Sequence, residues 1–439
     1  MQIALLRKYG GMVPRYTSYP TAPHFHDGIN DDVYRAWLGK MDEGENLSLY
    51  FHVPFCAKMC WFCGCHTKIV NRYDPVKDYA GLLLQEIDLL SEVMAKGPQV
   101  RHVHWGGGTP TILASDDFRR IMDQAQGVFD FAEDSEIAVE IDPRTLDQDK
   151  AKALAKAGVN RASLGIQDFN ETVQQAINRV QPKDVTARVI DWLRDAGIKA
   201  INFDLMYGLP HQTSADAIKS VDEAVSLNPD RLSLFGYAHV PWMKTHMQMI
   251  KDDDLPGDEA RLDQAESTAE RLQFHGYKRI GLDHFAKTGD DLVKALEAGT
   301  LQRNFQGYTN DTAGSLIGIG ASSIGRLEQG YVQNCPSIRE YRRALEAGKL
   351  PVKKGVELTT DDKNRRLIIE RLMCDLTVDV GPGYEDELNN LRPMKNDGVV
   401  EISGTTITVT ETGRPLVRSV CAVFDTYLNK NKARHSKAV

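Results

Sequence analysis

The sequence contains no long hydrophobic run, although it has 439 residues. No stretch approaches the roughly 20 consecutive apolar residues that a membrane-spanning helix needs. The first residues, MQIALLRKYGG, carry an apolar run that ends at Arg7 and Lys8, which is too short for a secretory signal peptide. We therefore expect a cytoplasmic protein without a membrane span.

Positive charge is also scarce. The 53 Lys and Arg residues are outnumbered by 61 Asp and Glu residues, so the formal net charge is −8. Nucleic acids and anionic membranes attract proteins with a basic surface. We therefore expect no nucleic-acid partner, and any anionic ligand has to be bound by a local basic cluster. Hydrophobic residues make up 42% and charged residues 26% of the chain, which excludes collagen-like, disordered and coiled-coil proteins.

The cysteines do not suggest a disulfide framework. There are seven, an odd number, and four of them fall between residues 56 and 65, while Cys335, Cys374 and Cys421 stand alone. Disulfide-stabilised domains are usually small and secreted, with paired cysteines. Clustered thiols in a reducing compartment more often hold a metal or carry out redox chemistry.

From residue 47 to 285, short apolar runs alternate with segments of helical periodicity. The apolar runs predict strands over residues 47–53, 100–105, 136–141, 161–166, 200–206 and 231–237. Helical spacing predicts helices near residues 75–96, 115–127, 147–157, 183–196, 213–227 and 258–275. Strict alternation favours right-handed βαβ units and a parallel sheet. Six units are too few for a closed eight-stranded barrel, so we expect an α/β fold, a partial (β/α)6 barrel with its chemistry at the carboxyl ends of the strands.

Four regions are predicted along the chain. Residues 1–46 contain PRYTSYPTAPHF, which cannot form a regular helix and predicts an N-terminal arm or lid. Residues 47–285 form the (β/α)6 domain, in which 277–285 adds a strand or leads out of the sheet. Residues 286–355 are a connecting region that completes the active site.

The last region, residues 356–439, is expected to be a small C-terminal winged-helix-like α+β domain. The pattern predicts helices at 361–375, 384–391 and 412–428 and a hairpin at 399–410. Between residues 358 and 428, eight Lys and Arg stand against twelve Asp and Glu. A wing that reads DNA is therefore not expected.

Cys56, Cys60 and Cys63 follow the first predicted strand in a C-x3-C-x2-C pattern. Three thiolates this close can converge on one iron–sulfur cluster, and one iron then stays open to a non-protein ligand. A structural zinc site from Cys60, Cys63, Cys65 and His66 is the alternative, but zinc sites normally draw on two separated pairs. The role of Cys65 is left open: it is a thiol that binds no metal, a spare ligand or a redox residue.

A glycine turn and several polar residues follow the other strands. Gly106, Gly107 and Gly108 end the second strand, and without side chains they allow a ligand to approach the backbone. The GxGxxG spacing of a dinucleotide site is missing. Four positions fall at or just past the ends of strands three to six: Glu140, Gln167, Asp204 and Ala238. We expect them to converge on one mouth, where they can bind a polar ligand.

These motifs resemble those of the radical S-adenosylmethionine enzymes. Within that superfamily, the sequence is similar to the oxygen-independent coproporphyrinogen III oxidases, also called coproporphyrinogen dehydrogenases. The resemblance covers nearly the whole chain through PRYTSYPTA (14–22), YFHVPFCAKMCWFCGC (50–65), HWGGGTPT (104–111), EIDPR (140–144), LGIQDF (164–169), NRVQ (178–181), FDLMYGLP (203–210), YAHVP (237–241), RNFQGYT (303–309) and IGIGASSIG (317–325). The C-terminal domain carries the least specific part of it.

The resemblance implies that Cys56, Cys60 and Cys63 hold a [4Fe–4S] cluster whose open iron binds S-adenosylmethionine. Matched motif by motif, it also assigns residues to two molecules of that cofactor. The contacts of the first are Tyr50, Gly107, Glu140, Ala238 and Ile324. The contacts of the second are Phe62, Gly108, Thr109, Gln167, Arg179 and Asp204. Tyr50 is in addition the candidate catalytic residue, because its phenol would lie near the sulfonium.

The reaction that the resemblance implies is the oxygen-independent oxidative decarboxylation of two propionates of coproporphyrinogen III to vinyl groups. A 5′-deoxyadenosyl radical starts it, and the product is protoporphyrinogen IX, on the way to haem. An electron donor and an electron acceptor take part, and the sequence identifies neither. We expect a monomer.

A substrate with four propionates requires cationic side chains around it. The candidates beside the matched motifs are Arg15, Lys68, Arg303 and Arg326. The aromatic residues of the arm, Tyr16, Tyr19 and Phe25, are expected to cover the mouth and exclude water, as radical chemistry requires.

Two alternatives stay open. One is a radical-SAM-like haem-binding chaperone without decarboxylase activity, although such relatives usually lack the PRYTSYPT arm and the CxC ending that this sequence has. The other is a zinc-binding interaction module, which would contain neither iron nor sulfide.

Overall fold

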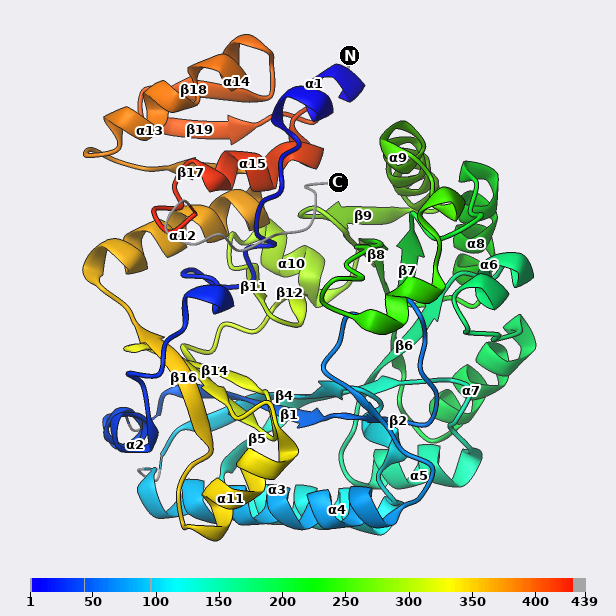
Figure 1. The fold of residues 1–439 in the computed structure, drawn as a ribbon, viewed down its shortest axis with the longest axis vertical. Helices are drawn as coiled ribbons and strands as arrows, with labels where there is room; N and C mark the ends of the chain where they lie inside the picture. The colour runs from blue at the N-terminus through cyan, green and yellow to red at the C-terminus, as the bar shows by residue number, and fades with distance from the viewer. Residues whose placement is uncertain (1, 43, 95–96, 429–439) are drawn as a thin grey trace.

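A 12-stranded sheet forms the centre of the molecule in the computed structural model, which describes residues 2–42, 44–94 and 97–428 (Figure 1). The strand order is β16-β15-β14-β13-β1-β4-β5-β6-β7-β8-β10-β9. Six neighbouring strands run parallel in chain order: β1 (Asn46–Val53), β4 (Gln99–Gly107), β5 (Asp130–Ile141), β6 (Arg161–Gln167), β7 (Ala200–Tyr207) and β8 (Arg231–Gly236). They are the six strands that the sequence predicts. The strand order ends at β16 and β9, so the barrel is partial, as expected.

Helices connect these strands and cover the outer face of the curved sheet (Figure 1). They are α3 (Asp74–Val93), α4 (Ser115–Val128), α5 (Gln148–Lys156), α6 (Glu171–Ala176), α7 (Lys183–Asp195), α8 (Ser214–Ser226) and α9 (Asp258–Phe274). Only α6 was not predicted, since six residues do not establish a helical period. Polar side chains cap the N-termini of several helices. The Asp147 side chain accepts from the Lys150 N–H at the start of α5, and Thr213 and Asp216 form a capping box at the start of α8. No helix in the described ranges is long and apolar enough to cross a membrane.

Side chains alternate between the two faces of each central strand. On β7, Ile201, Phe203 and Leu205 are buried in the main hydrophobic cluster with residues of the surrounding helices. The residues between them, Asn202 and Asp204, line a cavity inside the barrel. The same alternation on β5 and β6 turns their polar side chains toward that interior.

Strands from the connecting region extend the sheet beyond β1. β13 (Ser315–Ile319) runs parallel to β1, and β14 (Ile324–Leu327), β15 (Gly330–Asn334) and β16 (Val352–Glu357) follow in antiparallel pairs. At the opposite edge, β10 (His284–Lys287) pairs with β8 and with β9 (Tyr277–Ile280). The segment whose place was uncertain therefore joins the sheet as an edge hairpin. The remaining elements here are α10 (Asp291–Glu297), β11 (Gln302–Asn304), β12 (Gly307–Thr309) and α11 (Ile338–Glu346).

The C-terminal region has the helix and hairpin order expected of a winged-helix-like domain. It consists of α12 (Thr360–Asp375), β17 (Thr377–Asp379), α13 (Glu385–Asn390), α14 (Arg392–Asn396), β18 (Val400–Ser403), β19 (Thr406–Val409) and α15 (Val417–Ala422). The short strand β17 adds a third member to the predicted hairpin, and α15 is shorter than the helix expected over 412–428. Residues 429–439 of the predicted domain lie outside the described residues.

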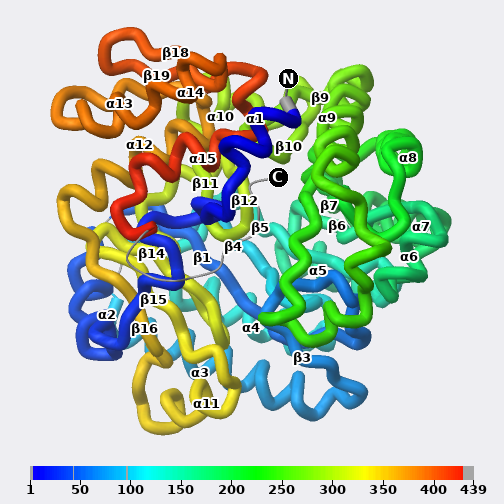
Figure 2. Tube along the Cα trace, turned by 45° about the horizontal axis from the view of Figure 1, so that its top comes forward, coloured from blue at the N-terminus to red at the C-terminus, as the bar shows by residue number. Residues whose placement is uncertain are grey.

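The N-terminal arm runs beside the C-terminal domain (Figures 1 and 2). It contains two short helices that were not predicted, α1 (Gln2–Tyr9) and α2 (Asp31–Leu38). Tyr16 donates a hydrogen bond to the Asp425 carboxylate at 3.1 Å, and the Tyr19 hydroxyl lies 3.1 Å from that of Thr426. Phe25 stacks on Tyr331 of β15 with ring centroids 5.7 Å apart. The three aromatic residues expected to cover the mouth therefore anchor the arm.

A buried hydrogen-bond network joins α3 to the strand that carries the cysteine loop. The Tyr79 hydroxyl donates to the His52 carbonyl oxygen at 2.9 Å and accepts from the Ala321 N–H at 2.7 Å. Glu86, about two turns further along α3, accepts from the Gly320 N–H at 2.7 Å and from the Asn334 amide at 2.6 Å. These bonds fix the glycine-rich turn after β13 against the end of β1.

We predict that Tyr79→Phe lowers the free energy of unfolding by about 1 to 3 kcal/mol, because two buried backbone groups lose their partner. Tyr34→Phe is the matched control, since this buried hydroxyl has no hydrogen-bond partner among the described residues. Urea unfolding followed by circular dichroism measures both. Equal effects of the two substitutions would contradict the prediction.

Candidate active site

The loop that carries the cysteines leaves the carboxyl end of β1 and is held by other loops of the same rim. Three side chains donate to its carbonyl oxygens: Asn178 to Met59 at 2.7 Å, His246 to Cys63 at 2.8 Å and Lys244 to Cys65 at 2.7 Å. Two short strands, β2 (Phe55–Cys56) and β3 (Lys68–Ile69), pair across the base of the loop. The cysteine backbone is therefore held by protein contacts on three sides.

Hydrogen-bond donors surround two of the thiols. The Thr109 hydroxyl lies 3.4 Å from Sγ of Cys56. The guanidinium groups of Arg144 and Arg179 lie 3.4 and 3.5 Å from Sγ of Cys60. Donors and positive charge stabilise thiolate sulfur, and they tune the potential of an iron–sulfur cluster that such sulfurs bind.

The thiols differ in acidity because their surroundings differ. Burial raises the pKa of the Cys56 thiol to about 11. A hydrogen bond from Cys65 lowers the pKa of Cys63 to about 6, and the nearby His246 and Lys244 act in the same direction. Binding of iron removes the remaining protons, because thiolate is the ligand form.

The donor set fits an iron–sulfur cluster better than a single ion. Within residues 2–42, 44–94 and 97–428, no three His, Cys, Asp or Glu side chains converge closely enough to hold one metal ion. The ring of His66 turns away, with Nε2 donating to the Pro336 carbonyl oxygen at 2.8 Å. The zinc alternative therefore lacks its ligand geometry, whereas a cluster of four irons spreads its three cysteines further apart.

A buried ionic group lies directly beside Cys60. The Asp142 carboxylate accepts from Arg144 at 2.6 Å and lies 3.5 Å from Arg179. Burial alone would raise the pKa of Asp142, but the two guanidinium groups hold it below its usual value. Arg179 is buried, and its Nε has no hydrogen-bond partner among the described residues. Arg179 and Gln167 crowd the same face of Gly165, so the pair expected at the second cofactor molecule does lie together.

The glycine turn at the end of β4 packs against Glu140. One carboxylate oxygen accepts from the Gly107 N–H at 3.2 Å and the other lies 3.0 Å from Nε2 of His104. The Tyr50 ring stacks on His104, with centroids 5.9 Å apart. Three residues expected at the first cofactor molecule, Tyr50, Gly107 and Glu140, are therefore neighbours.

The glycines of this turn are required by the chain itself. A Cβ atom on Gly106 would lie 2.8 Å from the Glu140 carboxylate, and one on Gly107 would lie 2.7 Å from the His52 ring. A Cβ on Gly108 would come within 2.5 Å of the Phe55 carbonyl oxygen. Side chains at these positions would therefore collide with the protein itself, and the predicted approach of a ligand to their backbone groups stays a prediction.

Tyr50 and His52 are held in their neutral forms. Burial, and then the charge of Glu140, raise the pKa of Tyr50 well above its ordinary value. Burial lowers the pKa of His52 to about 4. The Tyr50 hydroxyl lies 3.0 Å from Nδ1 of His52, and Nε2 of His52 lies 3.3 Å from the His66 carbonyl oxygen. Since Nε2 must donate to the carbonyl, Nδ1 accepts a hydrogen bond from the Tyr50 hydroxyl.

The barrel interior holds a polar cavity of about 200 Å³. Glu140, His104 and Asp204 line it. Burial raises the pKa of Asp204 to about 6, and the charge of Glu140 adds to this. Two neighbouring carboxylates and an imidazole can bind the hydroxyl or amine groups of a ligand.

A larger cavity of about 770 Å³ opens beside the cysteine loop. Cys65, Ala238 and Trp242 form part of its wall, and the arm contributes Met12, Arg15 and Thr17. Arg303 and Arg418 line it from the connecting region and the C-terminal domain. Arg15 and Arg303 were expected to bind substrate, whereas Arg418 was not identified from the sequence.

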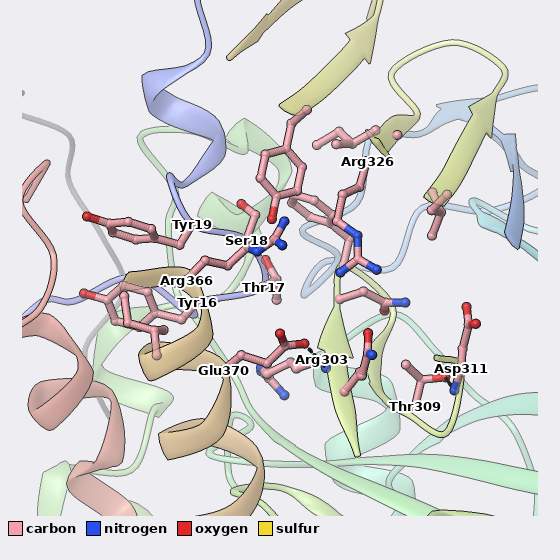
Figure 3. Close-up of a pocket in the computed structure, with 18 of the residues that line it drawn as sticks. Tyr16, Thr17, Ser18, Tyr19, Arg303, Thr309, Asp311, Arg326, Arg366 and Glu370 are labelled. Atoms are coloured by element: carbon pink, nitrogen blue, oxygen red, sulfur yellow. Dashed lines mark hydrogen bonds between the residues drawn. The ribbon is translucent and has the colours of Figure 1, made fainter. Parts of the chain in front are cut away.

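Four other predicted residues lie elsewhere. Ile324 and Arg326 line a neighbouring small cavity between β14, the arm and α12, which shares Thr17, Arg303 and Phe305 with the large one (Figure 3). Arg326 donates to the Ala313 carbonyl oxygen there at 2.7 Å. Lys68 is exposed on β3 and does not line the large cavity. Phe62 is half-buried and packs against a hydrophobic cluster below the cysteine loop.

Sequence reasoning missed several residues of the site: Asp142, Arg144, His246, Lys244 and Arg418. Asp142 and Arg144 stand in the EIDPR segment at the end of a predicted strand, so their position gave a usable signal. His246 and Lys244 act through contacts with the cysteine loop that no local pattern reveals.

Comparison with known proteins identifies the family. The Radical SAM superfamily model matches residues 50–224. The chain is 49% identical to the oxygen-independent coproporphyrinogen III oxidase of Bradyrhizobium diazoefficiens over 100% of both chains. It is 38% identical to the Escherichia coli protein of the same name, over 98% of this chain and 96% of that one. A solved structure of the Escherichia coli coproporphyrinogen III oxidase, described as a radical SAM enzyme, superposes with a TM-score of 0.90 at 37% identity and covers 97% of this chain and 99% of that one.

The chain belongs to the oxygen-independent coproporphyrinogen III oxidase family. The resemblance found in the sequence motifs is thereby confirmed, and so is the partial-barrel fold. The two cofactors expected of a radical SAM family member, the cluster and S-adenosylmethionine, follow from the same membership. The match extends over the arm and the C-terminal domain as well as the barrel.

We predict that Ser at position 56, 60 or 63 abolishes binding of the cluster in this family member, because each substitution removes one thiolate ligand. Cys65→Ser is the matched control and keeps full iron content, since three thiolates remain. Iron and sulfide analysis of protein purified without oxygen measures both. If Cys65→Ser loses its iron while the variants at positions 56, 60 and 63 keep theirs, the assignment of the three ligands is contradicted.

We also predict that Arg144→Gln shifts the cluster potential to more negative values, on the order of tens of millivolts, because it removes positive charge beside Cys60. Arg119→Gln is the control, since that arginine is exposed on α4 and pairs with Asp116 at 3.1 Å. A redox titration followed by electron paramagnetic resonance measures the shift. A potential equal to that of the control would show that Arg144 does not act on the cluster.

Proposed function

We propose that the protein catalyses the oxygen-independent oxidative decarboxylation of two propionates of coproporphyrinogen III to vinyl groups, which gives protoporphyrinogen IX in haem biosynthesis. The observation that carries the proposal is the cavity of about 770 Å³ between the cysteine loop and three arginines. Its volume is in the range of small-molecule sites. Relatives of the same length carry the name of this activity.

Cys56, Cys60 and Cys63 are the residues that hold the [4Fe–4S] cluster. With S-adenosylmethionine bound, this cofactor pair supplies the one-electron chemistry that starts removal of a hydrogen from the propionate. The protein contributes by binding, orienting and shielding the reactants.

The polar groups of the barrel interior bind S-adenosylmethionine in this proposal. Glu140 accepts hydrogen bonds from hydroxyl or amine groups of the first cofactor molecule, and the Ala238 backbone lies at the cavity wall. Gln167, Arg179 and Asp204 serve a second molecule. The Nε of buried Arg179, which has no hydrogen-bond partner among the described residues, is available to donate to a carboxylate of it. Phe62, Gly108 and Thr109 belong to the same group by position.

Tyr50 remains the candidate catalytic residue. Its phenol stays protonated at neutral pH, because burial raises its pKa, and it donates a hydrogen bond to His52. The Tyr50 side chain therefore acts as a neutral, oriented group beside the reacting atoms. Ile324 lines a neighbouring small cavity and contributes apolar surface.

An electron donor and an electron acceptor complete the reaction, since each decarboxylation is an oxidation. In this proposal the protein acts as a monomer. Its compartment is the cytoplasm, where the seven free cysteines stay reduced.

A haem-binding chaperone without decarboxylase activity is the alternative. The near full-length match to relatives named as oxidases, arm included, favours the enzyme.

Anaerobic incubation of the reconstituted protein with reductant, S-adenosylmethionine and coproporphyrinogen III tests the proposal. We expect 5′-deoxyadenosine and a product with vinyl groups, and neither with Cys56→Ser. Formation of 5′-deoxyadenosine without vinyl product would reject the substrate while leaving the radical chemistry intact. Haem binding with neither product would support the chaperone.

A further inference from the structure

Three arginines from distant parts of the chain meet at one end of the large cavity. Arg15 comes from the arm, Arg303 from β11 and Arg418 from α15. Two other arginines line the same cavity but are already engaged. Arg279 pairs with Glu266 at 3.4 Å, and Arg261 donates to the Tyr237 carbonyl oxygen at 2.9 Å.

Arginines outnumber carboxylates in the described lining of this cavity, five to four. Asp283 is a carboxylate near Arg303, and its Oδ1 lies 3.9 Å from Arg303 and 2.8 Å from the His284 ring. Burial, and then repulsion by Arg15 and Arg303, lower the pKa of Arg418 to about 10. Buried charge of one sign is costly unless a counter-charge is present.

The guanidinium group of Arg303 has hydrogen-bond donors without an acceptor among the described residues. Its side chain is only 6% exposed, and neither its Nε nor its Nη1 has a hydrogen-bond partner among the described residues. The guanidinium plane is fixed over the Tyr308 ring at 4.4 Å. A buried donor without an acceptor is unfavourable, so an acceptor is expected to enter from the cavity.

Arg418 holds the arm in place. Its Nε donates to the Pro14 carbonyl oxygen at 2.9 Å and its Nη2 donates to that of Val13. The next residue is Arg15, whose exposed side chain makes no hydrogen bond or ion pair with the described part of the chain. The contact thus presents Arg15 to the cavity.

We propose that Arg15 and Arg303 bind one carboxylate of the substrate and that Arg418 is the positioning residue that keeps the arm, and so Arg15, at this site. The proposal rests on the proposed function for the identity of the ligand, a propionate of the tetrapyrrole. Guanidinium and carboxylate form paired, charge-assisted hydrogen bonds, which fix orientation as well as affinity.

Binding is tested without turnover. Holoenzyme with cluster and S-adenosylmethionine, but no reductant, is titrated with coproporphyrin III and with its tetramethyl ester, and the change in porphyrin fluorescence gives both dissociation constants. We expect Arg15→Gln and Arg303→Lys to weaken binding of the acid about tenfold and to leave binding of the ester unchanged. Arg119→Gln, which removes the same charge from the distant α4, is expected to leave both unchanged.

Arg418 is tested by a readout of the arm itself. Arg418→Gln is expected to speed hydrogen exchange in residues 13–17 and to weaken binding of the acid, whereas Arg15→Gln weakens binding with exchange unaltered. An acid-to-ester affinity ratio that stays unchanged in Arg15→Gln and Arg303→Lys would overturn the proposal. Because no product is formed in this experiment, its result is independent of whether the turnover assay yields vinyl groups.

Discussion

The two-residue period of the parallel strands is the constraint on which the site depends. Helices cover the outer face of the sheet, so alternate side chains such as Ile201, Phe203 and Leu205 have to be apolar. The intervening positions face the interior, where His104, Glu140 and Asp204 line one cavity. A slip of one residue in register would exchange the two sets. The sheet that makes the core therefore also decides which polar groups meet.

The rim of the barrel is organised by contacts within the protein itself. Carbonyl oxygens of the cysteine loop accept hydrogen bonds from Asn178, Lys244 and His246, which belong to loops after β6 and β8. Glu140 accepts the Gly107 N–H in the same way. Preorganised groups need little rearrangement on binding, so these contacts lower the cost of ordering the cluster and its neighbours.

The sequence allowed the regular parts to be predicted closely, because strand and helix periods are local. The predicted strand at 161–166 became β6 (Arg161–Gln167), and the helix at 183–196 became α7 (Lys183–Asp195). The spacing of Cys56, Cys60 and Cys63 after the first strand, together with the family resemblance, indicates a loop that binds a cluster, and that role stays a prediction. The features that were not predicted depend on tertiary contacts. Tyr16 of the arm donates a hydrogen bond to Asp425, and Arg418 donates one to the Pro14 carbonyl oxygen. No local pattern links residues separated by some 400 positions.

In the proposed function, most of the cofactor contacts and the charged wall of the substrate cavity come from different parts of the chain. The radical SAM match spans residues 50–224, a range that includes the cysteine loop, Glu140 and Asp204 but not Ala238 or Ile324. The large cavity is closed by residues outside it, from Met12 at one end of the chain to Arg418 at the other. A barrel alone would therefore keep the polar interior and lose the charged wall. Because Arg418 ties the arm to the C-terminal domain, the two appendages form that wall only together, so the specificity of the site depends on the segments that the shared barrel lacks.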